Sequence, residues 1–130
     1  MAPTVLTKRA DFLAANRGLR VARPGFVLLA RPNGGEGMRY GITVTRKIGN
    51  AVVRNRMKRR FRELFWAALP EHGLPDHDHI LIGREGGIER DFGQLAQELE
   101  IALQRAAEGK GDRPRRPRKG DRRGKQAGGR

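Results

Sequence analysis

The segment from Arg46 to Arg62 restricts the fold more than any other part of the sequence, because it must bury one side and expose another that is strongly basic. It holds eight basic residues and no acidic one. A helical pattern runs from Ala51 to about Leu69, between the possible cap Asn50 and Pro70. At about 100° per residue, its apolar side chains share one arc: Val53, Met57, Phe61, Leu64, Phe65 and Ala68. This arc predicts a helix that lies on a hydrophobic core.

A second face of the same helix is basic. We call the following residues the basic stripe, since they cover an arc of about 140°: Arg54, Asn55, Lys58, Arg59 and Arg62. Like charges at i,i+4 repel, and cations near a helix N-terminus oppose its dipole. No carboxylate follows until Glu63, so phosphates would stabilise this face better than water would. The stripe therefore favours nucleic-acid binding over an ordinary solvated face, and its arginines suit bidentate phosphate contacts.

The rest of the chain predicts a mixed α/β (α+β) fold in the order α-β-β-β-α-β-α. Three strands and two more helices are expected from apolar periodicity and turn residues: helix 8–17, strands 26–30, 39–47 and 79–84, and helix 91–106. The first two strands are predicted to pair in antiparallel fashion. An extra short strand, which completes the four strands of this order, is expected in the Gly-rich connection between them. Residues 74–79 are expected to form a loop.

Composition points to a polyanionic partner. The chain has 130 residues, which suits one domain, and its 28 Lys and Arg against 14 Asp and Glu give a net charge of +14. It has no Cys, which excludes disulfides and thiolate zinc sites. No apolar run is long enough to span a membrane and no signal peptide is apparent, so a cytoplasmic location is expected.

The charge divides the chain into two parts. Residues 107–130 hold ten basic and three acidic residues and almost no apolar side chain, which predicts a disordered basic tail. Residues 1–106 form the predicted nucleic-acid-binding domain. Outside the segment 46–62, this domain has ten basic and eleven acidic residues, so a single cationic patch is expected.

Other motifs carry weaker signals. Asp76-His77-Asp78-His79 suggests a metal site, but no third ligand has suitable spacing, so a polar loop is the favoured interpretation. The chain has no Ser and no convergent set of His and carboxylate residues, which argues against hydrolysis by the protein itself. Phe12, on the first helix, is a core residue or a platform for base stacking.

The sequence Arg46-Lys47-Ile48-Gly49-Asn50-Ala51-Val52-Val53-Arg54-Asn55-Arg56-Met57-Lys58-Arg59-Arg60-Phe61-Arg62 closely resembles the arginine-rich signature of the protein subunit of bacterial ribonuclease P. The residues around it, over about 6–106, are similar to that family as well. The resemblance implies a two-layer sandwich related to a ribosomal-protein domain, with a left-handed βαβ crossover. It also implies the protein partner of a catalytic RNA, which removes the 5′ leader from precursor tRNA with RNA-bound magnesium, so no cofactor is expected on the protein alone.

The resemblance further implies two sets of site residues. Contacts with the RNA subunit would come from Arg46, Lys47, Arg54, Asn55, Arg56, Lys58, Arg59 and Arg62. The leader of precursor tRNA would lie in a cleft formed by Phe12, Val27, Leu29 and Thr43, with Arg54, Asn55, Arg59 and Arg62 at its wall. No catalytic residue, membrane contact or obligate protein partner is expected.

Two other functions remain open from the residues. A non-catalytic structural RNA-binding protein associated with ribosomal RNA would use the same basic helix. A protein that places this helix in the major groove of duplex DNA is less favoured, because no dimerisation segment or second recognition element follows.

Overall fold

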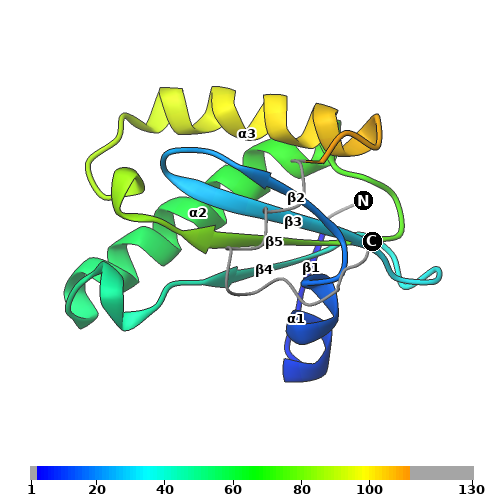
Figure 1. Cartoon of the computed structure of the whole chain (residues 1–130), viewed down its shortest axis with the longest axis horizontal. Coiled ribbons are helices and arrows are strands. Elements are labelled where there is room, and N and C mark those ends of the chain that lie inside the picture. The colour runs from blue at the N-terminus through cyan, green and yellow to red at the C-terminus, as the bar shows by residue number, and fades with distance from the viewer. Residues whose placement is uncertain (1–2, 112–130) are drawn as a thin grey trace, which may run out of the picture.

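The computed structural model describes residues 3–111, which form one five-stranded sheet and three α-helices (Figure 1). The elements, in chain order, are β1 (Thr4–Val5), α1 (Arg9–Ala15), β2 (Leu19–Ala22), β3 (Phe26–Pro32), β4 (Arg39–Thr43), a 3₁₀ turn (Arg46–Ile48), α2 (Ala51–His72), β5 (His77–Gly83), a second 3₁₀ turn (Glu85–Gly87) and α3 (Phe92–Ala107). The predicted order α-β-β-β-α-β-α is confirmed, and the two-residue strand β1 precedes it. None of the helices described in this range is long and apolar enough to cross a membrane.

The strand order is β1-β4-β5-β3-β2, and it corrects the predicted pairing. The strands starting at Phe26 and Arg39 are not neighbours, because β5 lies between them, antiparallel to β3 and parallel to β4. The residues 78–81 of β5 are all buried, and a strand covered on both faces belongs at the centre of a sheet. The additional strand, β2, precedes β3 and pairs with it, so it does not lie in the Gly-rich connection.

The connection from β4 through α2 to β5 joins two adjacent parallel strands. In Figure 1 both strands run to the left, β5 lies above β4, and α2 passes behind the sheet. This path is left-handed, as the resemblance implied, and opposite to the usual crossover. Helix α2 also continues through Pro70 to His72, three residues beyond the predicted end, and Gly73 N closes its last turn by donating to Leu69 O at 2.8 Å.

The main core lies between one face of the sheet and the pair α2 and α3 (Figure 1). The predicted arc of α2 is confirmed for all its members but Val53, which is only partly buried. In the same way α3 buries Leu95, Leu99 and Leu103, whereas Phe92 at its start is exposed. Two layers therefore carry most of the buried apolar surface.

The short helix α1 adds to this arrangement by covering part of the opposite sheet face (Figure 1). Ala15 is fully buried there, and Phe12 packs beside it against a smaller core that contains Leu29 and Ile80. Because α1 has only seven residues, it leaves part of this face uncovered.

The C-terminal helix passes the predicted domain boundary by one residue, ending at Ala107. The described chain continues to Gly111, whose Cα lies so close to β2 that a Cβ there would come within 2.9 Å of Leu19 Cδ2. The remainder of the predicted tail, residues 112–130, lies outside the described residues.

Candidate nucleic-acid interface

The N-terminus of α2 is formed by local side-chain contacts. Asn50 caps the helix as predicted, since its Oδ1 accepts a hydrogen bond from Val53 N at 3.0 Å. Arg54 Nε donates to Gly49 O at 3.2 Å, which holds this guanidinium back over the start of the helix. The 3₁₀ turn just before the cap carries Arg46 and Lys47, so the predicted strand 39–47 ends early, at Thr43.

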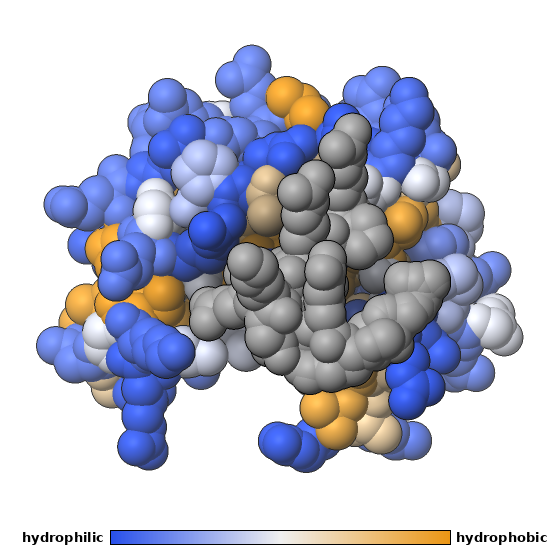
Figure 2. Space-filling view, viewed as in Figure 1, coloured by the Kyte–Doolittle hydropathy of each residue, from blue (hydrophilic) through white to orange (hydrophobic). Residues whose placement is uncertain are grey.

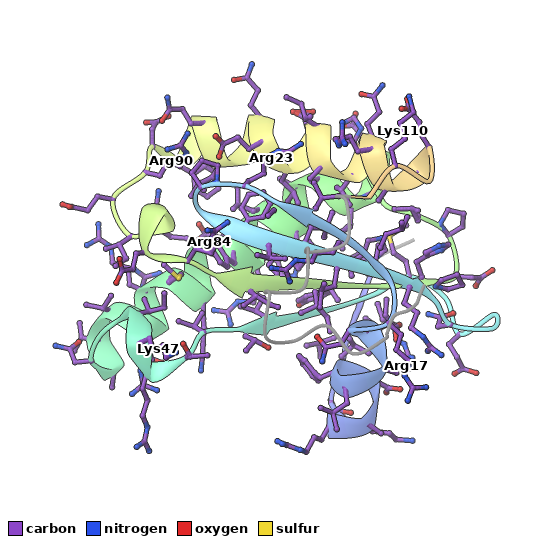
Figure 3. The ribbon with its side chains drawn as sticks, viewed as in Figure 1. Arg17, Arg23, Lys47, Arg84, Arg90 and Lys110 are labelled. Atoms are coloured by element: carbon purple, nitrogen blue, oxygen red, sulfur yellow. The ribbon has the colours of Figure 1, made fainter. Side chains whose placement is uncertain are left out.

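The basic stripe is accessible and has no counter-charge among the residues that the structure describes. Asn55, Arg59 and Arg62 are exposed, and Arg54 and Lys58 are partly exposed. Among residues 3–111, no carboxylate forms a salt bridge with any of these cations. In Figure 3, Lys47 lies near the beginning of α2, close to the N-terminal end of the stripe. A row of cations that residues 3–111 leave unneutralised is available to external phosphates.

Two other arginines of α2 lie off the stripe. Arg60 donates to three carbonyl oxygens, those of Gly87 at 3.2 Å, Ile88 at 3.1 Å and Arg90, and so fastens the loop after β5 to the helix. Arg56 lines a small hollow beside Arg60 and is exposed. Of the predicted RNA contacts on α2, Arg56 is therefore the one that points away from the others.

A cleft of about 460 Å³ lies between α1 and the uncovered sheet face. Three of the four residues predicted for its floor line it, namely Phe12, Leu29 and Thr43; Val27 lies in the core beneath and does not line it. The basic stripe does not line the cleft. Figure 2 shows the surface receding at the lower edge, between α1 and the region around Lys47 that Figure 3 labels.

The predicted set omitted other residues that line the cleft. The strand register places Ile80 between Leu29 and Gly41, and Ile82 between Val27 and Thr43. Their period-two spacing is a signal in the sequence that they share a face of the strand, but only the central position of β5 shows that this face is the cleft. The others come from or adjoin α1: Thr7, Arg9, Leu13 and Asn16.

Phe12 both packs on the sheet and lines the cleft. A Cβ at position 41 would lie 2.6 Å from Phe12 Cζ, so the glycine at Gly41 is what allows the ring to approach the strand. The ring is only partly buried, and its accessible part faces the cleft. The two alternatives from the sequence, core residue and accessible aromatic, therefore combine in one side chain.

The predicted polar loop at residues 74–79 is wrong at its C-terminal end, because His77 begins β5. Asp78 is 2% exposed and accepts from Arg39 Nε at 2.7 Å, Arg39 Nη2 at 3.0 Å and Asn33 Nδ2 at 2.9 Å. Burial acts to raise the pKa of Asp78, but these hydrogen bonds outweigh it and hold the pKa below its usual value. The ion pair joins β4 to β5 and leaves this carboxylate no free oxygen for a metal.

His79 has a structural role as well. Its Nε2 accepts from Leu74 N at 3.0 Å, so the proton is on Nδ1, which donates to Arg39 O at 3.0 Å. Burial is the main cause that lowers the pKa of His79 to about 4, so the ring is neutral at physiological pH. Within the described range, no group of three or more His, Asp and Glu could hold a metal ion.

The fold also distributes charge unevenly outside the stripe. Residues 3–31, which include α1 and β2, carry six basic and one acidic residue, whereas residues 71–106 carry three basic and eight acidic ones. The net charge of nearly zero that was expected for the domain outside the segment 46–62 is thus the sum of a basic N-terminal part and an acidic part that contains most of α3. The cleft lies on the basic side, and Arg9 contributes to its lining.

Comparisons with known proteins agree with this geometry. The family model described as Ribonuclease P matches residues 2–107. The ribonuclease P protein component of Erythrobacter litoralis is 80% identical over 117 residues, which are 90% of this chain and 96% of that protein. The corresponding component of Paramagnetospirillum magneticum is 42% identical over 106 residues, 77% of this chain and 80% of the relative.

Solved structures share the fold. The RNase P protein of Staphylococcus aureus aligns with a TM-score of 0.65 at 34% identity, over 77% of this chain and 92% of its own. The RNase P protein from Thermotoga maritima aligns with a TM-score of 0.67 at 33% identity, over 77% and 94%. A basic helix, a sheet with a cleft and a match along almost the whole described chain lead to one conclusion: this chain belongs to the family of bacterial ribonuclease P protein components.

Proposed function

We propose that the chain binds the RNA subunit of ribonuclease P through the basic stripe together with Arg46, Lys47 and Arg56, and that it assists removal of the 5′ leader from precursor tRNA. The observation that carries this proposal is the row of unneutralised cations on α2. Phosphodiester cleavage is assigned to the RNA subunit, because residues 3–111 show no hydrogen-bonded pair of a nucleophile and a general base. The protein contributes binding and orientation.

The cleft is proposed to hold the single-stranded leader of precursor tRNA. Its floor combines an accessible aromatic ring, Phe12, with the aliphatic side chains of Leu29, Ile80 and Ile82. Thr7, Thr43 and Asn16 add hydrogen-bonding groups, and Arg9 adds a positive charge. Unpaired bases stack on aromatic rings while cations follow the backbone, which matches this combination of side chains.

Magnesium is proposed to reside with the RNA subunit. Both oxygens of the buried carboxylate Asp78 are taken by Arg39. The protein's part in metal-dependent cleavage is therefore to neutralise phosphates, so that the RNA folds and binds its substrate at lower magnesium concentration. The complete particle is expected in the cytoplasm without an obligate protein partner.

The test is leader cleavage from precursor tRNA by a bacterial ribonuclease P RNA at low magnesium concentration, with and without the full chain. The chain should accelerate cleavage, and a variant with alanine at Arg54, Arg59 and Arg62 should accelerate it much less. Equal rates with and without the wild-type chain would refute the proposal. If the chain were instead a ribosome-associated protein, it would co-purify with ribosomal RNA rather than with the ribonuclease P RNA.

A further inference from the structure

Trp66 extends the basic stripe by one turn. It follows Arg62 at i+4, and at about 100° per residue its direction falls between those of Asn55 and Arg59. Its side chain is 54% exposed, although it is the largest apolar side chain of the helix and the only Trp of the chain. A large aromatic ring thus lies on the same face as the cations, where the stripe would otherwise end.

The indole is held in a defined orientation by a residue of the sheet. Trp66 Nε1 donates to Tyr40 Oη at 3.0 Å. Tyr40 is itself 6% exposed and packs against Phe65, with ring centroids 5.5 Å apart. The hydrogen bond gives the Tyr40 hydroxyl a partner. This role alone does not explain why about half of the indole surface is exposed to water. What it does provide is an aromatic surface with little rotational freedom.

A cation is already placed at this ring. The Arg62 guanidinium carbon lies 5.7 Å from the centre of the Trp66 ring, within the range of a cation–π contact. Arg62 forms no salt bridge with any carboxylate of residues 3–111. The pair therefore offers a phosphate-binding group and an aromatic surface side by side. One nucleotide has the matching parts, an anionic phosphate and a flat base.

We propose that Trp66 is a stacking platform for an unpaired nucleotide of the RNA subunit, with Arg62 binding a phosphate beside it. The inference rests on the proposed function, since it needs RNA along the basic stripe. The leader is not the expected occupant. Trp66 bonds to Tyr40, on the sheet face that α2 covers, whereas Gly41, the next residue of β4, faces Phe12 beside the cleft.

The full chain supplies its own probe, because all tryptophan emission comes from Trp66. A bacterial ribonuclease P RNA, titrated into the wild-type chain, should quench this emission and protect it from acrylamide. Inorganic polyphosphate, which has phosphates but no bases, should bind the stripe with little quenching. Equal quenching by polyphosphate and by RNA would overturn the stacking assignment. A leader oligonucleotide without the RNA subunit should also leave the emission nearly unchanged, and strong quenching by it would refute the choice of occupant.

Variants supply an independent readout by filter binding. Trp66→Leu removes the ring and should weaken RNA binding roughly tenfold, while Trp66→Phe keeps a ring and should recover most of the loss. Stacking releases no counterion, so the slope of log affinity against log salt should stay that of the wild type. Phe92→Leu, an exposed aromatic at the start of α3, is the matched control and should have no effect. Thermal melting verifies that each variant is folded.

The outcomes separate this inference from the function beneath it. If the wild-type chain binds the RNA tightly, but Trp66→Leu binds equally well and the emission does not change, the platform is refuted and the proposed function stands. If the wild-type chain does not bind the RNA at all, both fail. Loss of affinity in Trp66→Leu without recovery in Trp66→Phe would also contradict stacking, because it would indicate that only the hydrogen bond to Tyr40 matters.

Discussion

The salt dependence of RNA binding measures how many cations of the segment 46–62 meet phosphates. Seven of its eight basic residues are candidates, because Arg60 is occupied by backbone carbonyls. At about 0.9 counterions per contact, seven contacts give a slope near −6 in a plot of log affinity against log salt. Raising the salt from about 50 to about 200 mM should then weaken binding by roughly 10³ to 10⁴.

The double variant Arg59→Ala, Arg62→Ala removes the two cations at the C-terminal end of the stripe. With about five contacts left, the slope should fall to roughly −4.5, and the same salt step should weaken binding by only about 500-fold. Affinity for a bacterial ribonuclease P RNA is measured by filter binding at five or more salt concentrations. Lys110→Ala is the control: Lys110 is exposed beyond α3, at the opposite end of the molecule from Lys47 in Figure 3.

The salt-dependence slopes show whether Arg59 and Arg62 contact phosphates, because a slope depends on the number of phosphate contacts and not on the active fraction of protein. A double variant with the wild-type slope would remove Arg59 and Arg62 from the interface, even if its affinity were lower. A control variant that changed the slope as much as the double variant would show that charge anywhere on the protein matters equally. Either result would refute binding by a localised stripe.

Three further predictions concern the buried polar groups and the cleft. The unfolded chain binds a proton at His79 near pH 6.5 and the folded chain only near pH 4, so the free energy of unfolding should decrease by about 2 kcal/mol from pH 8 to pH 5. Urea denaturation should show this decrease in the wild type and much less of it in His79→Gln; equal pH dependence in both would contradict the assignment. Asp78→Asn removes the buried carboxylate that pairs with Arg39, whose other carboxylate partner is the more distant Asp11 at 3.7 Å, and should lower the free energy of unfolding by about 3 kcal/mol in the same assay. A loss below about 1 kcal/mol would show that the pair with Asp78 contributes little. Phe12→Ala should weaken binding of precursor tRNA to the assembled particle by roughly tenfold while leaving mature tRNA unaffected, and an equal effect on both would place the leader elsewhere.

Structural features that depend on residues close together in the chain could be predicted from the sequence. The apolar arc of α2, its cap at Asn50 and the buried face of α3 follow from contacts three or four residues apart, so helical periodicity contains them. The basic stripe and its exposure follow from the same periodicity. For this reason the residues proposed to bind the RNA subunit could be named before the fold was known.

The periodicity of apolar residues does not predict which strands pair with one another. The pattern of β5 predicted a buried strand, but its insertion between β3 and β4 depends on pairings with residues 39 to 57 positions away. That insertion brings Ile80 and Ile82 to the floor of the cleft and places Asp78 against Arg39. The sequence alone predicted a strand at 79–84 after a polar loop, but not which residues these side chains would contact.

The difference between what the sequence predicts for helices and what it predicts for strands has one physical cause. A helix satisfies its own backbone and reveals by spacing alone which face is apolar, whereas a strand needs partners that the chain supplies from far away. The sequence by itself therefore determined the basic helix and the family to which the chain belongs. Only the tertiary structure decided the cleft, the neutral buried state of His79, and the contact that holds Trp66 against Tyr40, a residue 26 positions earlier in the chain.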